Sequence, residues 1–146
     1  MKKGLYLDSN VFIYAAIYHE AGKGGVAKRI LLKLARGEIE GCTSSLTWDE
    51  LVWVVKRIEG LEAARKEGAK FLQLPNLKIL SVDNVVDLAQ KIIEKYDINP
   101  RDALHLACAL KNGIKEIVSD DRDLDRVKEI TRIPIAQAAG LSDSSK

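Results

Sequence analysis

Four acidic residues are placed so that their carboxylates could act together. Each follows an apolar run or lies near the start of a helical pattern, and the four are Asp8, Glu50, Asp102 and Asp121. They are separated by 42, 52 and 19 residues, so only the fold could bring them together. Carboxylates that share one site repel one another, raise one another's pKa, and ionise together readily only around a cation. Because all the ligands would be oxygens, the set favours Mg²⁺ or Mn²⁺ over zinc.

Each of these acids also has a structural explanation. Glu50 follows Thr47 by three residues and Asp102 follows Asn99 by three, which is the spacing of a helix capping box. Asp8 and the fourth acid each precede a segment that they could cap. For any one acid alone the capping role is the more common, but it does not explain why several acids should gather at one place. The residues alone leave both interpretations open.

Short apolar segments that alternate with helical patterns predict the architecture that would gather these acids. The strand-like segments are 5–7, 42–44, 77–80, 116–119 and a candidate fifth at 133–136. Continuous apolar strands are typical of a parallel sheet whose two faces are covered by helices. We expect an α/β fold, a three-layer α/β/α arrangement around a central parallel sheet of four or five short strands. In such sheets the carboxyl ends of the strands share one edge, and ligands bind there.

Apolar periodicity and helix-ending residues define the segments between these strands. The predicted helices are 11–18, 26–35, 46–58, 61–74, one capped by Ser81 or Asp83 that runs to about Tyr96, and one that follows Asn99 at Pro100 and closes at Gly113. The short connection between 46–58 and 61–74 predicts a helical hairpin.

Composition is that of a folded protein with one core. The chain has 146 residues, of which 47% are hydrophobic and 30% charged. We expect one domain over 1–140 and a flexible tail over 141–146. No apolar run approaches the roughly 20 residues of a membrane helix, and the first apolar run is too short for a signal peptide, so we expect no membrane association and a cytoplasmic location. Cys42 and Cys108 lie in apolar contexts without CxxC spacing, which predicts reduced core thiols.

Signatures of several other enzyme classes are missing from the sequence, which has no GxSxG elbow, P-loop or GxGxxG motif. His105 lies three residues after Asp102, where it could orient a carboxylate or contact RNA. A hydrogen-bonded core histidine is the favoured interpretation. His19 is expected at a helix end. Trp48 and Trp53 lie on different faces of one helix, and we expect one to pack in the core and the other to lie at an interface.

The four acids and their neighbours resemble the motifs of the PIN-domain family. The matching segments are Leu7-Asp8-Ser9-Asn10, Glu50 within SSLTWDEL, Asp102 within NPRDALHLACAL, and Asp121 within IVSDDRDLD. Their order and approximate spacing match the family across nearly the whole chain, and the size resembles the VapC-type toxins of prokaryotic toxin–antitoxin pairs. Each motif alone is weak, whereas four in order within 146 residues are fairly specific.

The resemblance implies a role for each of the four acids. Asp8 and Asp102 would bind the metal directly. Glu50 would act directly or through a water molecule, and Asp121 would complete the catalytic set.

Supporting residues are implied in the same way, and they are Ser9, Asn10, Ser119 and Asp123. Ser9 and Ser119 stand where the family commonly has threonine, and Leu124 replaces a phenylalanine, which are conservative departures. The doubling of acids at 120 and 121 leaves open whether Asp120, Asp121 or Asp123 is the fourth acid.

For function, the resemblance implies a Mg²⁺-dependent endoribonuclease, with Mn²⁺ as the alternative ion, that hydrolyses RNA with metal-activated water. It also implies an antitoxin partner and a homodimer. The 23 basic and 21 acidic residues, a net charge of +2, permit an RNA partner. Arg101 and Arg122 adjoin site acids and are expected to contact phosphate. The apolar helix 11–18 and its neighbours could offer a groove to an antitoxin helix.

Three alternatives remain beside this interpretation. An RNA-processing nuclease of the same family is the nearest. A metal-dependent phosphatase of similar layout would need an aspartyl nucleophile in a DxD motif, but Asn10 stands where the second aspartate would be. A binding module without nuclease activity is the third, and the presence of all four acids argues against it.

Overall fold

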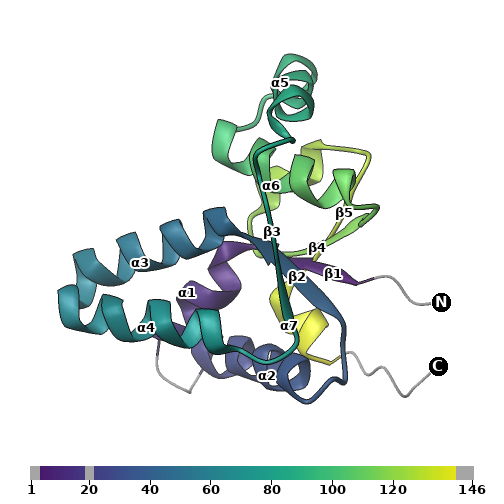
Figure 1. The fold of residues 1–146 in the computed structure, drawn as a ribbon. Coiled ribbons are helices and arrows are strands. Elements are labelled where there is room, and N and C mark those ends of the chain that lie inside the picture. Colours follow the sequence, from purple (N-terminus) through teal and green to yellow (C-terminus); the bar gives the residue numbers. More distant parts are fainter. Residues whose placement is uncertain (1–3, 19–21, 141–146) are drawn as a thin grey trace.

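The computed structural model describes residues 4–18 and 22–140, and within them the chain builds one parallel sheet (Figure 1). Its strands are β1 (Leu5–Leu7), β2 (Gly41–Ser44), β3 (Leu77–Leu80), β4 (Glu116–Val118) and β5 (Thr131–Ile133). The strand order is β3-β2-β1-β4-β5, and every neighbouring pair is parallel. The chain thus proceeds from β1 to one side of the sheet and returns to the other side at β4. Ligand sites of open parallel sheets lie at such a reversal, here between the carboxyl ends of β1 and β4.

Helices cover both faces of this sheet. They are α1 (Ser9–Ile17), α2 (Lys23–Ala35), α3 (Ser45–Glu59), α4 (Leu61–Gln73), α5 (Val86–Lys95), α6 (Pro100–Lys111) and α7 (Ile135–Ala139), and a 3₁₀ helix, η1 (Arg122–Arg126), links β4 to β5. In Figure 1, α1 to α4 and α7 lie on one side of the sheet, while α5 and α6 lie on the other. This is the three-layer α/β/α architecture predicted from the sequence.

Alternation along β1 divides the apolar core into two halves. Leu5 and Leu7 pack with α1 to α4 and α7, whereas Tyr6 packs with α5, α6 and η1. Cys42 and Cys108 are buried, free thiols in the second half, as predicted. Burial raises the pKa of Cys42 to about 12 and that of Cys108 to about 11, so both thiols stay protonated near neutral pH.

Several predicted segments have different bounds in the structure; α2, for example, begins at Lys23 rather than at Val26, and two further cases have a clear physical cause. The fifth strand ends at Ile133, where it was expected to begin, because Pro134 has no N–H for a strand ladder and a helix follows it. Helix α5 begins at Val86 rather than after Ser81 or Asp83. The Ser81 hydroxyl instead accepts a hydrogen bond from the Asp83 amide (3.1 Å) in the turn before the helix.

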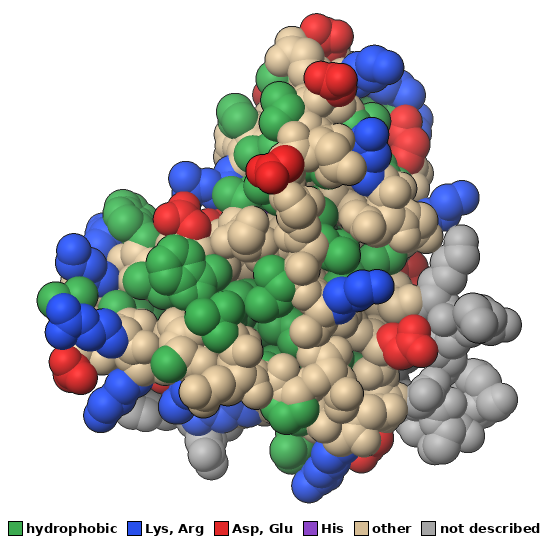
Figure 2. All heavy atoms as spheres, viewed as in Figure 1, with side chains coloured by type: hydrophobic (Ala, Val, Ile, Leu, Met, Phe, Trp, Pro, Cys, Tyr) green, Lys and Arg blue, Asp and Glu red, His purple; other side chains and the backbone are tan. Residues whose placement is uncertain are grey.

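The tryptophan prediction is also wrong, because both side chains are exposed, Trp48 to 42% and Trp53 to 55%. Trp48 rests on α4 at Gly68, where an added Cβ would lie 3.2 Å from the indole nitrogen, so only glycine allows this close contact without a shift. The ring of Trp53 lies 4.6 Å from the Arg57 guanidinium carbon. Figure 2 shows hydrophobic side chains gathered over the α3–α4 hairpin, so part of its surface is apolar.

None of the described helices is long and apolar enough to cross a bilayer. The predictions for His19 and for the tail at 141–146 lie outside the described residues.

Candidate active site

The reversal point of the sheet places Asp8 beside the end of β4. The Asp8 amide donates to the Val118 carbonyl (3.0 Å), which ties the ends of β1 and β4 together. Asp8 is also the N-cap of α1, and its Oδ1 accepts a hydrogen bond from the Ser9 amide (2.8 Å). The structural and the functional interpretations of this residue are therefore compatible: Asp8 caps a helix whose N-terminus opens at the carboxyl edge.

The second oxygen of Asp8 is held by Ser119, which directly follows β4. The Ser119 hydroxyl donates to Asp8 Oδ2 (2.6 Å), and both side chains are buried. Burial raises the pKa of Asp8, although the charge of His105 and the Ser119 hydrogen bond oppose this effect. A buried carboxylate with two donors is fixed in orientation, which is the condition a metal ligand must meet.

The Ser119 hydroxyl oxygen also accepts hydrogen bonds from two other neighbours. Because its proton goes to Asp8, the Ser119 oxygen accepts from the Asn10 side-chain amide (3.2 Å) and from the Asp121 backbone amide (3.0 Å). These contacts orient the Asn10 amide and leave its Oδ1 buried without a hydrogen-bond partner among the described residues. An orphaned oxygen beside Asp8 is available to accept a hydrogen bond from a bound water molecule or ligand.

Glu50 reaches the site from α3, which starts directly after β2. The predicted capping box is not formed, because α3 begins at Ser45 and the Thr47 hydroxyl pairs with that of Thr43 (2.7 Å). Thr43 in turn donates to the Leu7 carbonyl (2.8 Å), so α3 is tied to both β2 and β1. Freed from capping, the Glu50 carboxylate turns inward, with only 17% of its side chain exposed.

His105 is the partner of Glu50. Its Nε2 lies 2.6 Å from Glu50 Oε1 and 3.8 Å from Asp8 Oδ1. Burial alone lowers the pKa of this histidine, but the hydrogen bond to Glu50 and the charge of Asp8 outweigh burial, and the pKa is raised. His105 is a buried, hydrogen-bonded histidine, as favoured from the sequence, and it also contacts a site carboxylate, which was the alternative.

Asp102 lies in the first turn of α6, whose N-terminus reaches the same edge of the sheet. Asn99 is the N-cap of this helix, but its side chain makes no capping hydrogen bond. Burial and then the charges of Asp121 and Asp8 raise the pKa of Asp102 to about 7, with a smaller contribution from Glu50. The four acids thus influence one another electrostatically, although they come from distant parts of the sequence.

The three neighbouring acids after β4 have different contacts. Asp120 Oδ1 accepts from the Ile135 amide (3.0 Å), which fixes the start of α7. Asp121 caps η1 by accepting from the Asp123 amide (3.0 Å), and its charge acts on Asp102. The Asp123 carboxylate is half exposed and pairs with Arg126 (3.3 Å). All three acids have structural partners, and the action of the Asp121 charge on Asp102 favours Asp121 as the fourth acid.

The two arginines expected to contact phosphate are exposed, and neither forms an ion pair with a described residue. Arg101 opens α6 next to Asp102, and Arg122 opens η1 next to Asp121. Both are therefore available beside the site acids.

Sequence reasoning missed Tyr6 and Arg132, which support the site. Tyr6 donates its hydroxyl to Ser44 (2.9 Å) and contacts His105 (2.7 Å), and a tyrosine in a buried strand gives no signal of such a contact. Arg132 donates to the Ser119 carbonyl (3.0 Å) while it pairs with Asp125 (2.9 Å). The position of Arg132 within a short strand is the one sequence signal that could have revealed its contact with Ser119.

Tyr14 on α1 is a further neighbour that the sequence did not reveal. Burial and the charges of nearby acids, Asp120 first among them, raise the pKa of its hydroxyl. The Lys23 ammonium lies 5.1 Å from the centre of the Tyr14 ring. The acids thus have an aromatic and a cationic side chain on their α1–α2 side.

The donor set fits a divalent cation in chemistry. Asp8, Asp102 and Asp121 offer oxygen ligands, and a bound cation would offset both the burial and the repulsion that together raise the pKa of Asp102. Among the described residues, no three His, Cys, Asp or Glu side chains are already arranged as ligands of one ion. The acids therefore suit a divalent cation in ligand type and in charge. Water molecules would complete its coordination, as Mg²⁺ prefers.

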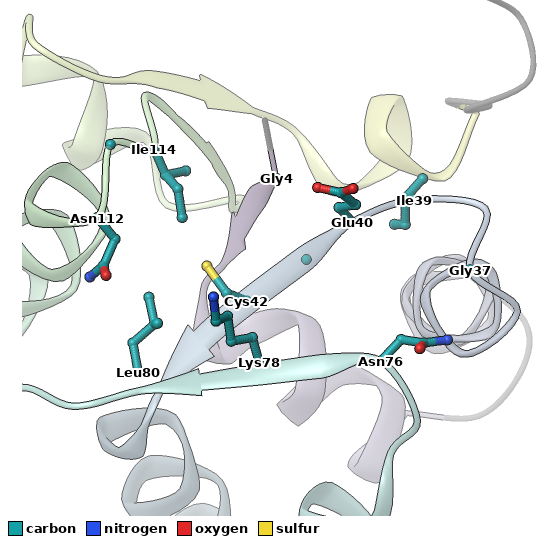
Figure 3. A pocket seen from close by; sticks show the side chains of 12 residues that line it. Gly4, Gly37, Ile39, Glu40, Cys42, Asn76, Lys78, Leu80, Asn112 and Ile114 are labelled. Atoms are coloured by element: carbon teal, nitrogen blue, oxygen red, sulfur yellow. The ribbon is translucent and has the colours of Figure 1, made fainter. Parts of the chain in front are cut away.

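A sizeable cavity lies elsewhere, at the amino edge of the sheet. It encloses about 690 Å³ and is lined by residues of β2, β3 and the end of α6. Figure 3 shows Cys42, Lys78 and Leu80 on neighbouring strands, facing Asn112 and Ile114 across this space. Glu40 is the one acid among the described residues that line it, so they form no carboxylate cluster there.

Comparison with known proteins gives the same fold. The chain is similar to VapBC2 of Rickettsia felis bound to promoter DNA, with a TM-score of 0.69 and 19% identity over 90% of this chain and 98% of the other. It is similar to VapC20 of Mycobacterium tuberculosis, a toxin that cleaves the sarcin-ricin loop, with a TM-score of 0.68 and 19% identity over 96% and 98%. DNA-bound VapBC of Salmonella typhimurium gives 0.70 and 19% over 92% and 99%. No curated protein sequence matches the chain.

The family itself follows from the sequence model of the PIN domain, which matches residues 5–130. This span runs from β1 through η1 and includes all four acids of the carboxyl edge. The chain belongs to the PIN-domain family.

Proposed function

We propose that this protein is a divalent-metal-dependent endoribonuclease and the toxin of a toxin–antitoxin pair. One observation carries the proposal: Asp102 lies at a buried edge with the other acids, so that burial first, and then the charges of Asp121, Asp8 and Glu50, raise its pKa to about 7. Acids that compete for protons in this way form one functional unit rather than separate helix caps. In this proposal residues 1–140 are a single nuclease domain.

The site residues divide the work between holding an ion and orienting groups around it. Asp8 and Asp102 would hold Mg²⁺, or Mn²⁺ in its place, with Glu50 and Asp121 completing the set directly or through water. When bound, the ion supplies a water molecule of lowered pKa and stabilises charge on the attacked phosphate. Ser119 keeps Asp8 in place (2.6 Å), and Asn10 presents an unpaired oxygen beside it. Arg101 and Arg122 would contact the phosphates of single-stranded RNA on either side.

An apolar groove supports the antitoxin as a partner. The groove encloses about 200 Å³ and is lined by Phe12, Leu31 and Phe71 among others, from α1, α2 and α4. It includes the apolar helix that the sequence proposed as a docking surface. The similar structures of R. felis and S. typhimurium are VapBC complexes. We also propose a homodimer, supported by exposed apolar side chains such as Trp53 and Leu72, and a cytoplasmic location.

The test is the Asp8→Asn variant in a cleavage assay with a fluorophore- and quencher-labelled single-stranded RNA of mixed sequence. Asparagine caps a helix nearly as well as aspartate, but it removes one negative charge from the site. We expect cleavage with Mg²⁺ to fall by at least about 100-fold, because activation of water requires the ion to be held in place. The melting temperature of the same preparation should be unchanged or slightly higher. A folded Asp8→Asn protein that cleaves RNA at the wild-type rate would contradict the proposal.

A further inference from the structure

We propose that His105 is a positioning residue for Glu50, and that Tyr6 and Ser44 anchor His105 to the sheet. The inference rests on the proposed function, since Glu50 matters only if the carboxyl edge binds a metal ion. It assigns a task to a buried polar group of the described structure that the proposed reaction does not otherwise use.

The contacts form one continuous chain from the sheet to the site. The Tyr6 hydroxyl donates to Ser44 Oγ (2.9 Å), the Tyr6 oxygen lies 2.7 Å from His105 Nδ1, and His105 Nε2 lies 2.6 Å from Glu50 Oε1. Tyr6 and Ser44 are fully buried on β1 and β2, and 1% of His105 is exposed. The imidazole is therefore held between two immobile strands on one side and the carboxylate on the other.

The allowed directions of these hydrogen bonds fix what His105 does. An ionised carboxylate can only accept, so the short contact requires a proton on His105 Nε2 that points at Glu50. With the Tyr6 proton given to Ser44, the Tyr6 oxygen is left to accept from His105 Nδ1. The imidazole then donates from both nitrogens, one to the sheet and one to the site acid.

This arrangement holds Glu50 Oε1 and leaves Oε2 without a hydrogen bond from any described residue. A glutamate on a helix otherwise loses considerable side-chain freedom when it must adopt one orientation. His105 removes that freedom in advance, which leaves the second oxygen available to an ion or a water molecule. The 3.8 Å separation between His105 Nε2 and Asp8 Oδ1 brings the same ring close to a second site acid. Outer residues that orient metal-site carboxylates act in this manner.

Packing alone is the competing account, because the Tyr6 and His105 rings also meet edge to face at 5.7 Å. Two substitutions separate the accounts. In His105→Gln the side-chain amide nitrogen falls near the position of Nε2 and can still donate to Glu50. In His105→Asn the shorter amide falls near Nδ1, so the contact with Tyr6 is kept and the one with Glu50 is lost. Ile117→Val is the control, since Ile117 is buried in the same half of the core without polar contacts.

The experiment measures kcat and KM for the labelled single-stranded RNA, the Mn²⁺ dissociation constant by calorimetry, and the melting temperature of each variant. We expect His105→Asn to lower kcat by about 10- to 100-fold with little change in KM, and to weaken Mn²⁺ binding by about 10-fold. His105→Gln should stay within about 3-fold of wild type in both measurements. In a Glu50→Gln background, His105→Asn should cause no further loss. Ile117→Val should lower only the melting temperature.

Equal effects of the Gln and Asn variants on Mn²⁺ affinity, or a His105→Asn loss that persists in the Glu50→Gln background, would overturn the inference. If wild-type protein binds Mn²⁺ but does not cleave RNA, the proposed function fails while the Mn²⁺ affinities still decide the role of His105. If it binds no Mn²⁺, both fail.

Discussion

The two edges of the parallel sheet differ in the side chains that they bring together. The amino edge holds the large cavity of about 690 Å³, yet its lining combines glycines, Leu80, the Cys42 thiol with a pKa of about 12 and the exposed Lys78. The carboxyl edge instead collects four interacting acids. These acids follow strands or lie near the start of helices at that edge, so the direction of the strands explains where they converge.

The direction of the helices explains part of this difference. In a parallel sheet each strand leads into a helix at the carboxyl edge, so α1 and α3 start there, and α6 starts there because its end leads back to β4. Helix N-termini carry unpaired amides and a partial positive charge, which favour carboxylates such as Asp8 and Asp102. The amino edge receives the helix ends, which offer carbonyl oxygens instead.

Of the substitutions that test the contrast between the two edges, Asp102→Asn is expected to have the largest effect. The change keeps the shape of the side chain and removes a proposed metal ligand, so cleavage of the labelled RNA should fall by at least about 100-fold at pH 8. Initial rates at saturating Mg²⁺ provide the measurement, with circular dichroism to establish that the variant is folded. Activity within about 3-fold of wild type would show that Asp102 holds no essential ion.

A smaller effect is expected from Ser119→Ala, measured as the free energy of unfolding in urea. The substitution removes the donor to Asp8 Oδ2 and the acceptor of the Asp121 amide. Because a buried carboxylate oxygen then lacks its partner, we expect a loss of about 1–3 kcal/mol. Ser119→Thr should keep both hydrogen bonds and most of the stability. Equal stability of the Ala variant and wild type would show that the carboxyl edge is less tightly organised than these contacts indicate.

The pH dependence of stability should also differ between wild type and Asp102→Asn when a chelator removes metal ions. The pKa of Asp102 is raised in the folded protein, to about 7, above its value in the unfolded chain. The folded state therefore binds more protons, and this contribution to stability is present at acid pH and is lost as the pH rises to about 7.

The Asp102→Asn variant cannot titrate at this position, so it does not lose stability in this way as the pH rises. Because Asp102 is partly exposed, we expect the variant to gain about 1–2 kcal/mol over wild type at pH 8 relative to pH 4. Urea unfolding at both pH values gives the comparison. A difference between the two proteins that does not change with pH would argue against a raised pKa of Asp102 in the folded protein.

The smallest effect is expected at the amino edge, from Lys78→Gln. Lys78 is exposed and forms no ion pair with a described residue, so its removal should change the free energy of unfolding by less than about 0.5 kcal/mol. RNA cleavage should be unchanged. A loss of cleavage in this variant would show that the cavity contributes to activity, and the contrast between the two edges would fail.

Most of the fold could be predicted from the sequence because the strands are apolar runs between clear helix signals. The segment 77–80 agrees with β3 residue for residue, and the hairpin of α3 and α4 agrees within a residue at each end. The errors fall where local signals are weak. Strand β5 includes Thr131 and Arg132, polar residues that an edge strand tolerates, and Val85 opens α5 without a side-chain cap.

The candidate site could be predicted only in part. Acids that directly follow strands, such as Asp8 and Asp121, are visible because strand ends are visible. The contact between His105 and Glu50 joins two helices 55 residues apart, and the Tyr6 hydroxyl reaches it from a third element. No local pattern encodes such contacts, since they depend on how α3 and α6 pack on the sheet. Sequence periodicity placed His105 on the right helix face but gave it no partner.

The most direct test of the account is calorimetry of Mn²⁺ binding at pH 6 in two buffers with different ionisation enthalpies. With a pKa of about 7, the Asp102 carboxyl is largely protonated at this pH, so an ion shared by the four acids must displace protons. The account predicts proton release in wild type, and both weaker binding and less release in Asp8→Asn. Binding without proton release, or equal binding by Asp8→Asn and wild type, would contradict a shared metal site at the carboxyl edge.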